Sequence, residues 1–138
     1  MIGLDTNVLA RYYIDDEADA QAQSQRLAAR RLIESGQPLM VCKSVILELE
    51  WVMRGYYGFA QPEVATVMQH LLDQPHITVE DRESVELALS HCGEGIDFAD
   101  ALHHASYRVC GSVASFDDRK FARRAKKLGL APAVVVPT

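Results

Sequence analysis

Short apolar segments alternate with longer amphipathic segments along the chain, and this alternation restricts its fold more than any other feature. The apolar segments are predicted strands, which cover Ile2–Leu4, Leu39–Cys42, Ile77–Val79, Ser112–Ser115 and Ala133–Val136. The first predicted helix follows a cap at Thr6 or Asn7 and runs to about Tyr13. The other predicted helices cover Ala18–Glu34, Val45–Gly55, Pro62–Leu72, Ser84–His91, Phe98–Cys110 and Phe121–Leu128. Parallel strands need crossover connections, and the crossover helices cover both faces of their sheet. The order therefore predicts an α/β fold, a three-layer α/β/α sandwich with a central, mainly parallel sheet.

Polar residues and glycines mark the ends of several predicted helices. Thr6 or Asn7 is expected to cap the first helix, and Ser44 is expected to cap the third. Gly111 is the expected C-terminal cap of the helix that begins at Phe98. These caps set the helix boundaries that the sequence predicts.

Size and composition predict one folded domain that covers residues 1–138. The chain has 138 residues, of which 49% are hydrophobic, enough for one core and too few for a second domain. The N-terminus does not resemble a signal peptide, and no apolar stretch is long enough to span a bilayer, so we expect a cytosolic protein with no membrane contact. Cys42, Cys92 and Cys110 lack metal-binding or disulfide spacing and are predicted to be reduced core residues.

Four carboxylates are predicted to meet at the carboxyl edge of the sheet, where parallel sheets place their functional clefts. Asp5 follows the first strand and Asp117 follows the fourth. Glu48 lies one turn into the helix after the second strand, and Asp100 lies near the start of the helix before the fourth. Glu50 is two residues beyond Glu48 and points in another direction, so Glu48 is preferred. Converging like charges repel unless a cation neutralises them, and oxygen-only ligands suit Mg²⁺ or Mn²⁺. The pattern predicts a divalent-metal site that can activate water and neutralise a phosphate.

Neighbouring acids leave this set of ligands partly open. Asp97 shares a helix face with Asp100, so it can either cap the helix or contribute a ligand. Asp117 and Asp118 are adjacent, and one can cap the basic helix while the other faces the metal. Asp117 is preferred because it is closer to the strand end. Each acid also has a structural alternative, as a helix cap or a partner of a helix dipole.

Four segments resemble, in order, the acidic motifs of PIN-domain ribonucleases. They are Leu4–Leu9 (LDTNVL), Ser44–Leu49 (SVILEL), Asp97–Leu102 (DFADAL) and Ser115–Phe121 (SFDDRKF). The resemblance spans nearly the whole chain. It departs from the family pattern in two respects, because Ser115 stands where Thr is frequent and the tandem Asp117-Asp118 leaves the last ligand open.

The resemblance implies a metal-dependent endoribonuclease that hydrolyses RNA phosphodiester bonds with Mg²⁺ or Mn²⁺. The implied catalytic metal ligands are Asp5, Glu48, Asp100 and Asp117. Asp97 is a secondary ligand candidate, and Asn7 and Ser115 are implied to support the site. The small size resembles the VapC toxins of type II toxin–antitoxin pairs, which implies a cytosolic RNase, a VapB-like antitoxin and a homodimer.

A cationic segment near the C-terminus is the predicted contact with the RNA backbone. The net charge is −5, but six of the fourteen basic residues fall within residues 119–127. The RNA-contact candidates are Arg119, Lys120, Arg123 and Arg124. Lys and Arg that neutralise phosphates add salt-dependent affinity, whereas the structural alternative is a solvated helix face.

Two other kinds of function fit parts of the sequence. A catalytically silent PIN-like module could use the same acids to bind the arginines of a regulatory partner. A receiver-like phosphoacceptor domain also has an Asp at a strand end, but that Asp follows the third strand. Here the strand-end acids follow the first and the fourth strands. The aromatic strip of Trp51, Tyr56 and Tyr57 fits a core, a dimer surface or an antitoxin groove.

Overall fold

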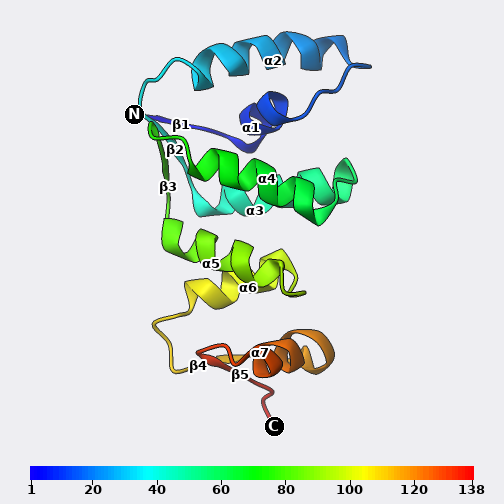
Figure 1. Cartoon of the computed structure of the whole chain (residues 1–138), viewed down its shortest axis with the longest axis vertical. Helices are drawn as coiled ribbons and strands as arrows, with labels where there is room; N and C mark the ends of the chain where they lie inside the picture. Colours follow the sequence, from blue (N-terminus) through cyan, green and yellow to red (C-terminus); the bar gives the residue numbers. More distant parts are fainter. The chain divides into compact units, whose positions relative to one another are not determined.

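The computed structural model describes residues 1–138 as two compact units, Met1–Arg82 and Glu83–Thr138 (Figure 1). The elements of the first unit are β1 (Ile2–Gly3), α1 (Thr6–Tyr13), α2 (Ala20–Ile33), β2 (Leu39–Val41), α3 (Lys43–Trp51), η1 (Val52–Tyr56), α4 (Gln61–Leu72) and β3 (Ile77–Val79). The second unit follows with α5 (Arg82–Cys92), α6 (Phe98–Ser106), β4 (Ser112–Ala114), η2 (Asp118–Ala122), α7 (Arg123–Leu128) and β5 (Ala133–Val135). Both η1 and η2 are short π-helical turns.

The first unit is built on a parallel sheet with the strand order β1-β2-β3. Leu39 of β2 pairs with Ile2 on one side and with Ile77 on the other, so the central strand is β2. Helices α1 and α2 connect β1 to β2, and α3, η1 and α4 connect β2 to β3. The carboxyl ends of all three strands therefore lie at one edge, where Asp5 follows β1.

Helix faces rich in aliphatic residues form the core of the first unit. Helix α1 packs against α2 and α3, and α4 packs against β3 and η1. The largest fully buried side chains here are Leu9, Ile33, Leu39, Val41, Ile46, Leu49, Met53, Met68 and Leu71. Burial of these apolar groups, more than helix propensity, fixes the short elements in place.

The second unit pairs β4 with β5 in parallel and packs α7 against β5. Buried Ser84 of α5 donates its hydroxyl to the Ala105 carbonyl of α6 at 3.3 Å. The ring of buried His104 donates from Nε2 to the Pro132 carbonyl at 2.8 Å, which connects α6 to the segment before β5. Phe98, 1% exposed, anchors the first turn of α6 in the core.

The predicted fold class is confirmed, since helices alternate with strands that all pair in parallel. Two predicted caps are wrong. Asp5 caps α1, because its extended backbone lets Oδ1 accept from the Thr6 N–H at 2.8 Å, and α1 begins at Thr6. Cys42 holds the cap position of α3, so Ser44 lies inside the first turn.

Boundaries in the second unit also differ from the prediction. Helix α6 ends at Ser106 with Tyr107 as its C-cap, so Gly111 does not cap it. The basic segment begins as the π-helical turn η2 and becomes α-helical only at Arg123. The prediction of three core cysteines is wrong, because Cys110 is exposed and the other two are half-buried.

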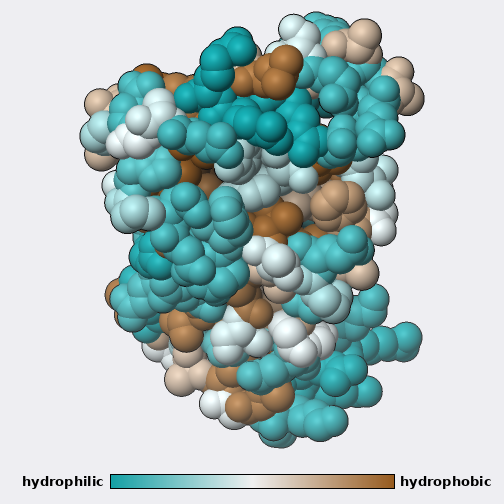
Figure 2. Space-filling model, turned by 45° about the horizontal axis from the view of Figure 1, so that its top comes forward, coloured by the Kyte–Doolittle hydropathy of each residue, from teal (hydrophilic) through white to brown (hydrophobic).

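Hydrophilic side chains cover most of the face drawn in Figure 2, where hydrophobic residues form separate patches. No helix of this chain has the length and hydropathy that crossing a membrane requires.

Candidate active site

Asp5 and Glu48 line one cavity in the first unit, with a volume of about 470 Å³. Asp5 reaches it from the end of β1, where it also caps α1. Glu48 reaches it from α3, the helix that follows β2. Both side chains belong to exposed residues. The structure thus brings together the first two acids of the predicted site.

The same cavity contains a buried polar group without a partner. Thr6 lines the cavity and is 6% exposed, and its Oγ1 atom makes no hydrogen bond. A buried hydroxyl without a partner loses the free energy of its hydration and is uncommon in folded proteins. Asn7 lies next to it in the lining. Asn7 is exposed, so its side chain gives the cavity hydrogen-bonding capacity for a ligand or for water.

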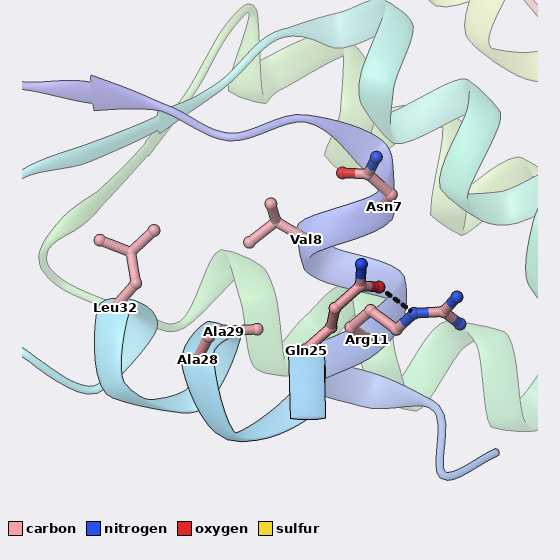
Figure 3. A pocket seen from close by; sticks show the side chains of 7 residues that line it. All are labelled: Asn7, Val8, Arg11, Gln25, Ala28, Ala29 and Leu32. Carbon is pink, nitrogen blue, oxygen red and sulfur yellow. Dashed lines mark hydrogen bonds between the residues drawn. The ribbon is translucent and has the colours of Figure 1, made fainter. Parts of the chain in front are cut away.

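Arg11 supplies the cation of this cavity and was not predicted from the sequence. It follows Asn7 by one helical turn, so the two share a face of α1, which is the signal that could have identified it. Arg11 Nε donates to Gln25 Oε1 of α2 at 2.8 Å, which holds the guanidinium in place. Figure 3 shows this hydrogen bond in a neighbouring cavity that α1 and α2 form, lined also by Val8, Leu32 and two alanines.

Glu50 has a structural role that separates it from Glu48. It is 4% exposed, and its carboxylate accepts two hydrogen bonds from Arg54, at 2.8 Å from Nε and 3.3 Å from Nη2. This bidentate ion pair connects α3 to η1. Glu48, two residues earlier, lines the cavity instead.

Two further acids follow β3 at the same sheet edge and were not predicted. Glu80 Oε1 accepts from the Lys43 backbone N–H at 2.7 Å, and Asp81 Oδ2 pairs with Lys43 Nζ at 2.9 Å. Asp81 has a positive φ of 49°, which Asp tolerates better than most residues. Both carboxylates are engaged with the start of α3, so they stabilise the junction of β2 and α3.

The second unit brings together Asp97, Asp100 and Asp117. Burial raises the pKa of the Asp100 carboxyl, and the negative charges of Asp97 and Asp117 raise it further, while His103 lowers it. Asp97 occupies the N-cap position of α6 but makes no capping hydrogen bond with its side chain. The negative charges of Asp97 and Asp117 thus lie close enough to Asp100 to disfavour its ionised form.

Ser115 shapes the loop that presents Asp117. Its hydroxyl accepts from the Asp117 backbone N–H at 3.1 Å, and Asp117 Oδ1 accepts from the Lys120 N–H at 3.0 Å. Asp117, and not the adjacent Asp118, is therefore the cap of η2. Asp117 has a second carboxylate oxygen, Oδ2, for any further role.

The chemistry of these side chains suits a hard divalent cation. The acids of each unit offer oxygen atoms alone, and mutual repulsion at Asp100 is the kind that a cation relieves. No three or more His, Cys, Asp or Glu side chains are arranged to hold a metal ion together. Mg²⁺ is compatible with such an arrangement, because it keeps several waters and binds one or two carboxylates together with substrate phosphates.

The predicted RNA-contact residues are exposed on two consecutive elements of the second unit. Arg119 and Lys120 lie on η2, and Arg123 and Arg124 begin α7. Their exposure leaves the charge of this cationic segment available to an anionic partner.

Replacement of Asp100 by Asn is expected to stabilise the protein at pH 7. A carboxyl whose pKa is raised by folding stabilises the folded state only while it is protonated, so its contribution is lost as the pH rises through that raised pKa. Asn removes the charge, and we expect the melting temperature to rise by about 2 °C at pH 7. Thermal unfolding at pH 7 and pH 3 measures the effect, which should vanish at pH 3. Glu17→Gln, on exposed Glu17 in the loop before α2, is the control, and a lower melting temperature for Asp100→Asn at pH 7 would contradict the prediction.

One family model matches the chain, and it is described as the PIN domain. The match covers residues 2–127, so it includes every acid described above. No curated protein matches the chain significantly.

Proposed function

Because the chain belongs to the PIN-domain family, whose members are generally metal-dependent nucleases, we propose that it is a Mg²⁺- or Mn²⁺-dependent endoribonuclease. The observation that carries the proposal is the cavity where Asp5 and Glu48 lie beside the unpartnered Thr6 hydroxyl. This arrangement has the charge and the hydrogen-bonding groups of a site for a cation and a phosphate, and Asp5 caps α1 as well.

The proposed metal ligands are Asp5 and Glu48 in the first unit and Asp100 and Asp117 in the second, with Asp97 as a further candidate. The bound cation would activate a water molecule and neutralise charge on the phosphate. Asn7 can donate its amide to a phosphate oxygen in the cavity, since it lines the cavity. Ser115 acts indirectly, because it holds the loop of Asp117.

The cationic segment is the proposed contact with the RNA backbone. Its exposed residues Arg119, Lys120, Arg123 and Arg124 offset the overall charge of −5 locally. Electrostatic contacts of this kind give affinity that falls as salt rises and carry no sequence preference. The RNA sequence that is cut must then be selected elsewhere on the protein.

The resemblance to VapC toxins supports a narrower proposal. In it the chain is the toxin of a type II toxin–antitoxin pair, acts on a cytosolic RNA, forms a homodimer and is held inactive by a VapB-like antitoxin. The four acidic motifs occur in the order of PIN-domain ribonucleases in general, and they are compatible with this role. Copurification of a small partner that suppresses cleavage would be the supporting result.

Removal of divalent metal is expected to abolish RNA cleavage. The purified chain, freed of any partner by unfolding and refolding, is incubated with a total RNA pool in Mg²⁺, in Mn²⁺ or in EDTA. Gel analysis should show cutting in at least one metal and none in EDTA, because no cation is then present to activate water. Addition of metal after EDTA should restore cutting. A folded protein that cuts in no metal would favour the silent interaction module instead.

A further inference from the structure

The cavity that holds Asp5 and Glu48 also has two exposed aromatic walls. Trp51 is 56% exposed and Tyr56 is 72% exposed, and both line it. Large aromatic side chains are normally buried, because exposing them forfeits much of the hydrophobic free energy they can contribute. Here two aromatic side chains are exposed in one cavity that also contains carboxylates and an arginine. This combination indicates a binding surface for a flat ligand with polar edges.

The π-helical turn η1 is the reason that both rings reach the same cavity. In an α-helix, residues five apart point about 140° away from each other. Here the Tyr57 N–H donates to the Val52 carbonyl at 3.1 Å, a bond that spans five residues and widens the turn. In the widened turn, residues five apart are separated by about one turn. Trp51 and Tyr56 therefore lie on the same side of the helix. Such turns are frequent at functional sites.

Gly55 determines where the indole of Trp51 lies. A Cβ atom at this position would be 3.1 Å from Trp51 Cε2 and 3.2 Å from Nε1, closer than side chains normally approach. The ring therefore rests against the backbone of η1, and an alanine at position 55 would displace it by a few tenths of an ångström. Tyr56 is held in turn by an edge contact with the Tyr57 ring, at a centroid distance of 4.8 Å.

We infer that Trp51 and Tyr56 form a stacking subsite for an unpaired nucleobase. The inference rests on the proposed nuclease function. It adds a way in which the RNA strand is held beside the acids. Arg11 in the same lining supplies a cation for the adjacent phosphate, and the exposed side chain of Asn7 offers hydrogen bonds to polar edges. A nucleotide matches this combination of aromatic faces, a cation and polar groups, whereas an apolar helix of a protein partner would leave the polar groups unsatisfied.

Binding of single-stranded RNA is expected to quench the fluorescence of Trp51, the only tryptophan in the chain. The probe is an unstructured RNA octamer, added in EDTA and low salt so that no strand is cut. An RNA duplex of the same sequence should quench far less, because its base faces are already stacked. A DNA octamer tests whether the subsite distinguishes sugars, since stacking alone accepts both single strands. Equal quenching by duplex and single strand would overturn the inference.

Substitutions at Trp51 separate stacking from general structural effects. Trp51→Ala should weaken binding of a labelled RNA octamer about 10-fold in fluorescence anisotropy, and Trp51→Phe should stay within about 3-fold because it keeps an aromatic face. Gly55→Ala should weaken binding partially, since it displaces the indole. Tyr107→Ala, which removes an aromatic residue 50% exposed at the end of α6, is the matched control and should bind like the unmodified protein.

The outcomes distinguish this inference from the proposed nuclease function. If the protein cuts the RNA pool in a metal-dependent way but Trp51→Ala binds RNA with unchanged affinity, the stacking subsite alone is overturned. The aromatic pair would then be assigned to the binding of a protein partner. Absence of both cutting and octamer binding would overturn both proposals. Quenching by single strands together with the 10-fold loss in Trp51→Ala would establish the subsite even if cleavage proves to need another substrate.

Discussion

Asp5→Asn is expected to lower metal-dependent RNA cleavage by at least about 100-fold while the protein stays folded. Asn is nearly isosteric with Asp, but it lacks the negative charge that a cation needs. It is also as good an N-cap as Asp, so the hydrogen bond from the Thr6 N–H to position 5 can persist. The substitution therefore removes the charge and keeps the cap. Initial rates of cleavage, with circular dichroism of the same samples, measure both properties.

Matched substitutions sharpen this test. Asp5→Ala should lose cleavage equally and also lose about 1 kcal/mol of stability, because it removes the cap as well. Asp19→Asn changes a capping Asp that accepts from the Gln21 and Ala22 N–H groups of α2 and does not line the cavity, so its rate should be unchanged. If Asp5→Asn cuts RNA like the unmodified protein, Asp5 serves α1 alone and the proposed ligand set is wrong.

Most of the fold could be predicted because the strands and helices differ in periodicity. Leu39–Val41 and Ile77–Val79 are short, apolar and bounded by turn residues, so they could be identified as buried parallel strands. Helix caps were harder to predict. Asp5, Thr6 and Asn7 are all capping residues, and only the backbone conformation of Asp5 decides which one accepts the first N–H. The π-helical turns were not predicted, because they are rare single-turn insertions in α-helices.

The site could be predicted in part, since strand ends indicate where acids gather. Glu80 and Asp81 also lie at a strand end. Their position along the chain could not show that Glu80 accepts a hydrogen bond from Lys43 and that Asp81 forms an ion pair with it. It also could not show that Trp51 and Tyr56 are exposed in the cavity of Asp5, because the same residues fit a core equally well. Ion pairing and exposure depend on contacts between segments that are distant in sequence. The residue pattern of a single segment does not predict these contacts.

Arg54→Ala is expected to destabilise the protein by about 2–3 kcal/mol. The side chain of Glu50 is 5% exposed, and the Arg54 guanidinium donates to both of its carboxylate oxygens. The substitution leaves this carboxylate buried without that partner. Loss of one partner from a fully buried pair costs about 3–5 kcal/mol, and the expected value is lower because the Arg54 side chain is 45% exposed. Urea denaturation at pH 7 gives the free energy of unfolding, and the melting temperature should fall by about 6–10 °C.

Two controls assign this loss to the ion pair. Arg54→Lys keeps the charge but cannot donate in the bidentate geometry of a guanidinium, so its loss should be about 1 kcal/mol. Arg31→Ala removes an exposed arginine from the last turn of α2 and should cost less than about 0.5 kcal/mol. An Arg54→Ala protein as stable as Arg31→Ala would show that water reaches Glu50. The carboxylate of Glu50 would then be as available to a cation as that of Glu48, and the assignment of the cavity acid on α3 would have to be tested again with Glu50→Gln.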